Sequence, residues 1–362
     1  MILFIAQEYN AYFGGGVITN RNLTICKDVL GHNNLSTYLL PSKVSGGIKT
    51  LKAFITGYLM ELSADHEIKI LKILADSTDI KYVFIDSSML GRLSKAIKTQ
   101  FPHIHVIVFF HNIEYLFFLN FLSVTKRYWH GIGLWSIYKN EKLAIEYSDS
   151  IISLNSRDSN NIKKKYHRSA DLILPTSLQD KFNKDLLEPV SPDKPLSLLF
   201  VGSRFYPNEQ GLSWFIKEVM PYVNNARLTI IGKGFEELKE QWNSSNINVI
   251  GACSDMAPYY YHADIVIAPI FSGSGMKTKT AEALMYGKTI VASTEAFEGY
   301  DIDKSLVGGE FNLSSEYINY INSFRYSGTH KFNPTSREYF ERKYSFNSSI
   351  KILKKFISNV PD

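Results

Sequence analysis

Cysteine is scarce in this sequence: Cys26 and Cys253 are the only two in 362 residues, one in each half of the chain. Two such cysteines cannot build the disulfide framework of a small secreted domain, and they are too few for a cysteine-based metal cluster. We therefore predict a protein of a reducing compartment, located in the cytoplasm.

Long apolar runs are also missing. The longest ones, such as Val106–Phe110 and Leu116–Leu119, are far shorter than the roughly 18 residues of a membrane-spanning helix. The chain starts with a strand-like stretch, Ile2–Ala6, without a basic region followed by an apolar one, so we expect no secretory signal. These absences predict a soluble protein that can still contact a membrane with its surface.

The net charge of +5 is unevenly distributed along the chain. Residues 1–185 hold 22 Lys and Arg against 16 Asp and Glu, whereas the remainder holds 18 against 19. A basic first half is consistent with an anionic partner, either a bilayer surface or a phosphate-bearing acceptor. A well-solvated surface explains this modest excess equally well. We expect no nucleic-acid partner.

Short apolar strands alternate with amphipathic helices along the whole chain. In the first half we predict strands at Ile2–Ala6, Leu35–Leu40, Tyr82–Asp86, His105–His111, Ser150–Leu154 and Leu172–Leu174. In the second half we predict them at Leu196–Gly202, Arg227–Gly232, Asn246–Gly251, Ile265–Pro269 and Thr289–Ser293. Helices are predicted at Asn22–Leu30, Leu51–Leu62, Tyr138–Tyr147, Gly211–Tyr222 and Phe346–Ser358. Continuous apolar strands separated by helices form parallel sheets covered on both faces, so the fold class is α/β.

A polar stretch with three prolines, residues 188–195, has the composition of an interdomain linker. The length of the chain also suits two domains rather than one. We therefore predict an N-terminal domain over 1–187, a second domain over 196–345, and a closing helix within 346–362. Ligands bind beyond the carboxyl ends of the strands in doubly wound, Rossmann-like domains, so the two are expected to face each other across a cleft.

The most informative motif lies in residues 268–288, where a strand ends in a Ser-Gly-Ser-Gly loop that opens a helix. Small residues let backbone amides approach a diphosphate, and a helix N-terminus adds partial positive charge. Lys279 and Glu282 are three residues apart and share one helix face, whereas Lys277 should point elsewhere. We predict that Lys279 contacts phosphate and that Glu282 accepts hydrogen bonds from ribose. The alternative is a plain turn followed by an exposed Lys279–Glu282 pair.

A second motif closes the first strand of the second half. Arg204 follows Val201, Gly202 and Ser203, at the same edge of the predicted sheet as the glycine-rich loop. A guanidinium there can bind the same diphosphate through two hydrogen bonds. A surface arginine without a ligand is the alternative.

Together these pieces make residues 201–287 similar to the donor domain of retaining glycosyltransferase family 4, the glycosyl transferases group 1, which have the GT-B fold. The matching segments are Val201–Arg204, Leu228–Gly234, Val249–Gly251, Ala263–Pro269 and Glu282–Gly287. The resemblance implies that Arg204 and a lysine bind the pyrophosphate of the donor, that Glu282 binds the ribose, and that the backbone of Ile250 and Gly251 lies against the base. Further donor contacts are expected from Ser203, Ser274, Gly275, Met276 and Lys277.

The sequence departs from the usual family pattern at two positions. Ser274 stands where the family has a glutamate that contacts the donor sugar, and Gln210 stands where it has a lysine. One subgroup carries a Gly-Ser-Gly loop and additional basic residues at this place, which this chain matches. Lys279 or Lys277 is then expected to supply the charge that is missing at Gln210.

The first half resembles the same family less closely. Gly15 and Gly16 belong to a glycine loop after the first strand, which in the family approaches the donor diphosphate; a flexible turn is the alternative. His111 ends a strand and begins a His-Asn-x-Glu segment that in the family lies near the donor sugar, although a lone histidine is often a satisfied core residue. Asn155 or Ser156 is expected to cap a helix.

Aromatic and basic residues occur together in two further places, at residues 115–129 and 163–168. The first suits a bilayer surface or an acceptor groove, and packing against the first-domain core accounts for it equally well. The second is a basic run that is available to anionic lipid, with a solvated helix end as the alternative. We therefore expect peripheral contact with an anionic membrane as one option.

The resemblance implies a retaining, metal-independent hexosyltransferase without a cofactor. Its donor is expected to be a UDP-sugar, and its acceptor a glycan or lipid-linked molecule in surface polysaccharide or glycoconjugate synthesis at the inner face of the cell membrane. Two alternatives remain: a catalytically silent GT-B partner subunit, suggested by Ser274 and Gln210, and a nucleotide-sugar epimerase. A dehydrogenase is disfavoured because no Gly-x-Gly-x-x-Gly follows the first strand.

Overall fold

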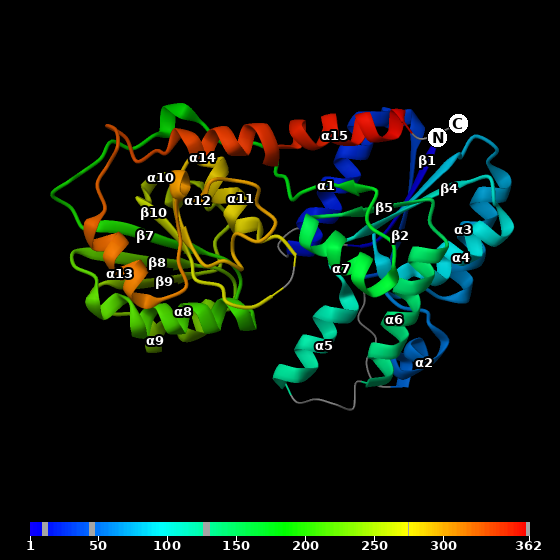
Figure 1. The fold of residues 1–362 in the computed structure, drawn as a ribbon, viewed down its shortest axis with the longest axis horizontal. Coiled ribbons are helices and arrows are strands. Elements are labelled where there is room, and N and C mark those ends of the chain that lie inside the picture. Colours follow the sequence, from blue (N-terminus) through cyan, green and yellow to red (C-terminus); the bar gives the residue numbers. More distant parts are fainter. Residues whose placement is uncertain (9–13, 43–47, 126–130, 274, 360–362) are drawn as a thin grey trace. The chain divides into compact units, whose positions relative to one another are not determined.

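A computed structural model describes residues 1–8, 14–42, 48–125, 131–273 and 275–359 of the chain. The chain divides into two compact units. The first comprises Met1–Pro175 together with Ser349–Asp362, and the second comprises Thr176–Ser348. Figure 1 shows a parallel sheet with helices in each unit.

The first unit is built on a six-stranded parallel sheet in the order β2-β1-β3-β4-β5-β6. Its strands are β1 (Ile2–Gln7), β2 (Leu35–Leu40), β3 (Tyr82–Ile85), β4 (His105–Phe110), β5 (Ser150–Ser153) and β6 (Leu172–Ile173). The strands β1, β3 and β4 are apolar on both faces and almost completely buried, as expected for central strands of a parallel sheet.

Helices connect the strands of the first unit. They are α1 (Gly14–Leu30), α2 (Ile48–Thr56), α3 (Ala64–Asp76), α4 (Gly91–Gln100), α5 (Glu114–Thr125), α6 (Gly131–Glu146) and α7 (Ser156–Tyr166). Side-chain oxygens cap the N-termini of α3 and α7. Ser63 accepts a hydrogen bond from the backbone amide of His66, and Asn155 accepts one from the backbone amide of Asp158. The predicted capping role of Asn155 is confirmed.

The second unit contains another six-stranded parallel sheet, in the order β12-β11-β10-β7-β8-β9. Its strands are β7 (Leu196–Val201), β8 (Ala226–Ile231), β9 (Ile247–Gly251), β10 (Ile265–Ala268), β11 (Thr289–Ala292) and β12 (Gly308–Glu310). Its helices are α8 (Tyr206–Glu218), α9 (Lys239–Trp242), α10 (Ala257–His262), α11 (Thr278–Met285), α12 (Lys304–Val307), α13 (Ser314–Ser323) and α14 (Pro334–Tyr339). The last helix, α15 (Phe346–Ser358), begins in this unit and continues in the first.

The predicted fold class is confirmed, and eleven of the strands lie where the sequence placed them, within one or two residues. The predicted helix Leu51–Leu62 is wrong in its second half, because α2 ends at Thr56 and Gly57 adopts a φ of 75°. The helix predicted from Asn22 begins earlier, at Gly14. Strand β12 was not predicted, because its Gly-Gly-Glu sequence has no strand propensity.

The division between the units falls at Pro175 rather than in the proline-rich stretch 188–195. That stretch is joined to the second unit by backbone hydrogen bonds: Lys331 donates to the carbonyl of Glu188, and Val190 donates to that of Thr329. A proline-rich composition therefore marks an edge segment of the second unit here.

Candidate active site

The residues of the second unit that were singled out in the sequence lie at one edge of its sheet. In a parallel sheet all strands end at the same edge, so the loops that follow them meet there. Arg204 follows β7, Ile250 and Gly251 end β9, and residues 269–277 join β10 to α11. Sequence segments that are far apart thus contribute to one region.

The loops after β7 and β8 are in backbone contact. The amide of Arg204 donates to the carbonyl of Lys233 at 2.8 Å. A Cβ atom on Gly232 would lie only 1.8 Å from the carbonyl oxygen of Gly202, so a larger residue cannot stand there without a shift of the backbone. The close contact between these two loops fixes the backbone position of Arg204.

Arg204 is paired with two carboxylates. Its Nε donates to Glu209 at 2.7 Å and its Nη2 to the same carboxylate at 3.2 Å, while Nη1 donates to Glu237 at 2.6 Å. The hydrogen bond to Glu209 and the nearby charges raise the pKa of Arg204 above its ordinary value. All three side chains are at least partly exposed, so an anionic ligand can exchange with these carboxylates.

Lys279 is buried, in contrast to the alternative of an exposed helix pair. Its ammonium donates to Asn208 Oδ1 at 2.6 Å and lies 4.2 Å from the centre of the Phe200 ring. Asn208 in turn donates to the carbonyl of Ser203 at 2.7 Å, so Lys279 is linked to the loop that carries Arg204. Burial, reinforced by the charge of Lys277, lowers the pKa of Lys279 to about 7.

Glu282 lies one turn beyond Lys279 on α11. The hydroxyl of Tyr260 donates to its Oε2 at 2.8 Å, and the Tyr260 ring stacks on Tyr286 with centroids 4.7 Å apart. Burial raises the pKa of Glu282, opposed by the hydrogen bond from Tyr260 and the charge of Lys279. A half-buried acceptor held on one side by a tyrosine is suited to accept hydrogen bonds from a diol.

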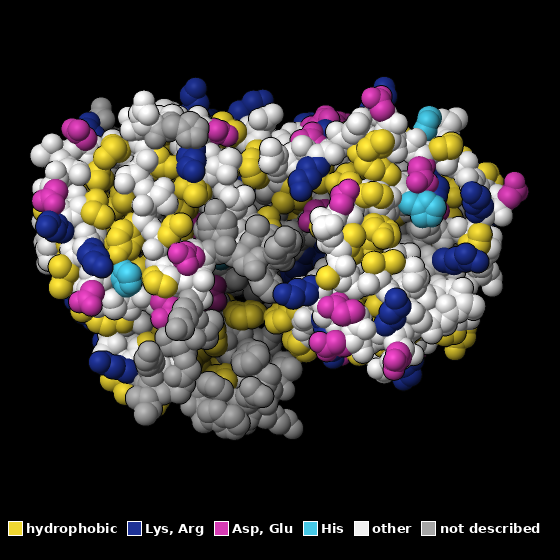
Figure 2. Space-filling model, turned by 180° about the vertical axis from the view of Figure 1, so that it is seen from behind, with side chains coloured by type: hydrophobic (Ala, Val, Ile, Leu, Met, Phe, Trp, Pro, Cys, Tyr) yellow, Lys and Arg dark blue, Asp and Glu magenta, His cyan; other side chains and the backbone are white. Residues whose placement is uncertain are grey.

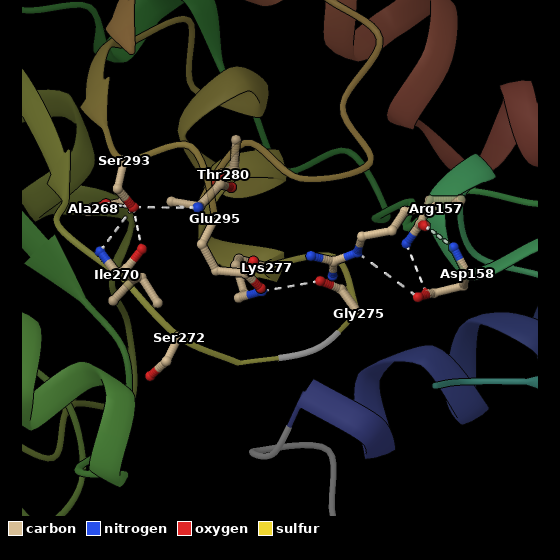
Figure 3. A network of polar contacts seen from close by, with 12 residues as sticks. Arg157, Asp158, Ala268, Ile270, Ser272, Gly275, Lys277, Thr280, Ser293 and Glu295 are labelled. Carbon is tan, nitrogen blue, oxygen red and sulfur yellow. Dashed lines mark hydrogen bonds and ion pairs between the residues drawn. The ribbon is translucent and has the colours of Figure 1, made fainter. Parts of the chain in front are cut away.

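Hydrogen bonds hold the glycine-rich loop at both of its ends (Figure 3). At its start, the Ile270 amide donates to Ser293 Oγ at 3.1 Å. At its end, Lys277 donates to the carbonyl of Gly275 at 3.0 Å and to Glu295 at 2.6 Å. Lys277 and Lys279 therefore point to different partners, as predicted.

The other residues that were predicted to contact the donor differ in how deeply they are buried. Met276 is buried, and its sulfur accepts from the Thr176 amide at 3.4 Å. Gly251 has a φ of 85°, and a Cβ atom there would meet Glu236 at 2.8 Å. Ile250 beside it is half-buried. Ser274 lies outside the residues that the structure describes.

In the first unit, His111 directly follows β4 and is held by Asp86. Its Nε2–H donates to the backbone carbonyl of Asp86 at 3.0 Å and to the Asp86 carboxylate at 3.1 Å. The other oxygen of this carboxylate accepts from Asn22 at 2.6 Å. Burial alone would lower the pKa of His111, but the charge and hydrogen bond of Asp86 raise it above its ordinary value.

The same cluster contains Arg21, which sequence reasoning missed. It is completely buried on α1, its guanidinium carbon lies 5.4 Å from the Phe109 ring centre, and among the described residues its nitrogens have no hydrogen-bond partner. Burial lowers the pKa of Arg21 to about 10. Gly15 and Gly16 form the first turn of the same helix. Arg21 and Asn22 come two turns after a glycine triplet, which is the signal that could have drawn attention to them.

Glu141 was also missed, although it positions the segment that carries His111. This fully buried carboxylate of α6 accepts from the amides of Glu114 and Tyr115 at 2.7 and 3.3 Å, and from the Tyr166 hydroxyl at 2.6 Å. It thereby binds the amides at the start of α5 from another helix. Burial raises the pKa of Glu141 to about 7. The sequence signal for Glu141 is a glutamate on the apolar side of a helical pattern.

One Asp-x-Asp pair is present, at Asp301 and Asp303. Asp301 pairs with Lys343 at 2.6 Å, whereas Asp303 accepts from the backbone and hydroxyl of Ser305 and starts α12. Within the described part of the chain, no three His, Cys, Asp or Glu side chains are grouped so that they could hold a metal ion.

Residues 195–307, which include Arg204, Lys279 and Glu282, match the family model described as Glycosyl transferases group 1. A 44.6 kDa protein from a cps region of Klebsiella pneumoniae is 29% identical over 175 residues, which is 43% of this chain and 45% of that protein. The match thus spans less than half of the length of this relative.

Solved structures resemble the chain over nearly its whole length. Anabaena HepE, in complex with UDP and glucose, has a TM-score of 0.67 at 11% identity. The lipopolysaccharide outer core galactosyltransferase WaaB has 0.69 at 15%, and a glycosyltransferase from Rickettsia africae has 0.66 at 14%. Each comparison covers 99% of both chains. The chain therefore has the GT-B fold of two parallel-sheet α/β domains.

Proposed function

We propose that this chain is a glycosyltransferase that moves a hexose from a nucleoside diphosphate sugar to a glycan or lipid-linked acceptor in surface polysaccharide synthesis. The observation that carries the proposal is that Asn208 links Lys279 to the loop of Arg204, with Glu282 one turn further along α11, all within the segment that matches the family model. The structural neighbours bound to UDP or UDP-glucose support UDP as the nucleotide.

In the proposed reaction the difficult step is departure of the nucleoside diphosphate from the anomeric carbon. Arg204 and Lys279 bind its phosphates and stabilise the charge that develops on the leaving oxygen, together with the first amides of α11. The donor phosphates displace Glu209 and Glu237 from the guanidinium. Binding also favours the charged form of Lys279, whose pKa of about 7 leaves it partly neutral without a ligand.

The remaining site residues orient the donor. Glu282 accepts hydrogen bonds from the ribose hydroxyls, and the backbone of Ile250 and Gly251 lies against the base. Ser203, Ser274, Gly275, Met276 and Lys277 surround the diphosphate and the sugar. We propose retention of configuration, with the acceptor hydroxyl entering on the face from which the diphosphate leaves and giving its proton to that phosphate. This route uses no divalent metal.

For the first unit we propose a role on the acceptor side. His111, held by Asp86, contacts a hydroxyl of the transferred sugar, and the glycine loop of Gly15 and Gly16 at the start of α1 approaches the acceptor and the diphosphate. We propose that the protein works in the cytoplasm at the inner face of the membrane, where a lipid-linked acceptor would be found.

A thermal-shift series with UDP, GDP, ADP, dTDP and CMP tests the donor site. One nucleotide, expected to be UDP, should stabilise the wild type, and Arg204→Ala should reduce its affinity by about 10- to 100-fold because charged hydrogen bonds are lost. Arg227→Ala is the matched control. Arg227 is an exposed arginine at the second position of β8, and the loop that contacts Arg204 follows the other end of this strand. No shift with any nucleotide would favour the silent partner subunit.

Product analysis then identifies the reaction. Transfer with the anomeric configuration preserved, unchanged by EDTA, is the expected outcome. Conversion of the sugar on an intact nucleotide, without any acceptor, would instead indicate an epimerase. Inversion of configuration or loss of transfer on chelation would contradict the retaining, metal-independent mechanism.

A further inference from the structure

Three neighbouring helices of the first unit expose large apolar side chains to solvent. Leu51 and Ile55 on α2 are 46% and 63% exposed, and Ile132 and Trp135 on α6 are 51% and 56% exposed. Leu119 on α5 adds a fifth exposed apolar side chain, at 40%. A cluster of this kind on a folded protein marks an interaction surface.

Helix α6 packs against both α2 and α5, which brings the three helices into one layer of the first unit (Figure 1). Gly133 of α6 lies against the Phe54 ring of α2, where a Cβ atom would come within 2.9 Å of it. Tyr115 of α5 and Tyr138 of α6 meet edge to face with centroids 5.5 Å apart. The inward sides of the helices are therefore used for packing, and the residues named above face outward. We call them the α2/α6 face.

Basic residues outnumber acidic ones on the exposed sides of α2 and α6, where α6 exposes one glutamate, Glu146, paired with Lys142 at 3.6 Å. The sequence contains no Asp or Glu from residue 29 to 60 or from residue 115 to 140. Lys52 and Lys139 are exposed there, and the Lys139 ammonium lies 5.1 Å from the Trp135 ring centre. On the side of the molecule that Figure 2 shows, basic and acidic side chains are interspersed.

We propose that the α2/α6 face docks onto an anionic lipid bilayer. Exposed Ile, Leu and Trp side chains enter the boundary between headgroups and acyl chains, while Lys52 and Lys139 remain among the anionic headgroups. In the described residues no helix is long and apolar enough to span a bilayer. This docking surface rests on the proposed function, for which it supplies the membrane contact. Vesicle binding can be measured without a sugar donor or an acceptor.

Vesicle sedimentation of the full chain tests the proposal. The protein should sediment with phosphatidylcholine vesicles containing about one third phosphatidylglycerol, and much less with pure phosphatidylcholine. Ile55→Ser should weaken binding to the anionic vesicles by about tenfold. Raising the salt concentration should weaken binding without abolishing it, because only the electrostatic part is screened.

The chain offers a matched control in Ile68. It lies on α3 in the same unit and is 63% exposed, as Ile55 is, but it stands between Glu67 and Lys69. Ile68→Ser should bind vesicles like the wild type, and thermal unfolding should confirm that both variants are folded. The proposal is overturned if the wild type does not sediment with anionic vesicles, if both variants bind equally, or if Ile55→Ser changes only self-association. Failure here would leave nucleotide binding intact, which separates it from failure of the proposed function.

Discussion

Lys279 reaches across from α11 to place its ammonium 2.6 Å from the Asn208 side chain of α8 and 4.2 Å from the centre of the Phe200 ring. This places a cation with a lowered pKa, about 7, next to the loop that carries Arg204. A lysine that is half-charged near neutral pH can respond to the arrival of an anion by taking up a proton.

Nucleotide affinity should therefore depend on pH through Lys279. The charged form binds the diphosphate, so binding raises the pKa of Lys279, and affinity should fall by up to about tenfold per unit as the pH rises above 7. Titrations between pH 7.5 and 9 avoid ionisation of the terminal phosphate, whose own pKa is about 6. Lys279→Met should bind weakly with a flat profile over this range. An unchanged slope in this variant would assign the pH dependence to another group.

Glu209 should compete with the donor for Arg204. Replacing it by glutamine keeps the size of the side chain but removes the negative charge that now pairs with the guanidinium. We expect Glu209→Gln to bind the nucleotide about fivefold more tightly, measured by calorimetry. Glu218→Gln, at the far end of the same helix, should leave the affinity unchanged. Weaker binding by Glu209→Gln would mean that Glu209 orients Arg204 rather than competing for it.

Gly211→Ala should destabilise the protein although alanine is the better helix former. The helical preference alone would stabilise α8 by about 1 kcal/mol. However, a Cβ atom on Gly211 would lie 1.7 Å from the carbonyl oxygen of Pro269, so α8 or the loop after β10 must shift. A net loss of about 2 kcal/mol in the free energy of unfolding is expected in urea denaturation. Gly328→Ala, where a Cβ atom meets nothing within 4 Å, should be nearly neutral.

Asp86→Asn should lower the pKa of His111. In the folded protein Asp86 holds this pKa above its ordinary value, with Glu114 adding to the effect and the Arg21 charge opposing it. The pair therefore stabilises the fold at low pH, and this contribution is lost as the pH rises through the folded pKa of His111. NMR titration of the imidazole, assigned with His111→Gln, measures the shift. A pKa that does not fall in Asp86→Asn would exclude Asp86 as its cause.

The sequence predicted those features that depend on local pattern. Strand positions follow from short apolar runs between helices, and the different directions of Lys277 and Lys279 follow from helical spacing. The burial of Lys279 did not follow, because it depends on Phe200 and on Asn208, which lies 71 residues away in the chain. Glu141 was missed for the same reason, since its hydrogen-bond partners lie on α5, on α7 and at Ser88. Long-range pairing leaves no trace in local periodicity.

The first unit is formed by two segments that are separated in the chain, and this affects the order in which the units can fold during synthesis. The second unit is one continuous segment, Thr176–Ser348, set within the first, whose last piece is Ser349–Asp362. Leu353, in that last piece, is buried. Domains fold as units during synthesis, from the N-terminus onward. The second unit can complete its sheet before α15 is synthesised, whereas part of the apolar surface of the first unit stays uncovered until α15 has emerged from the ribosome.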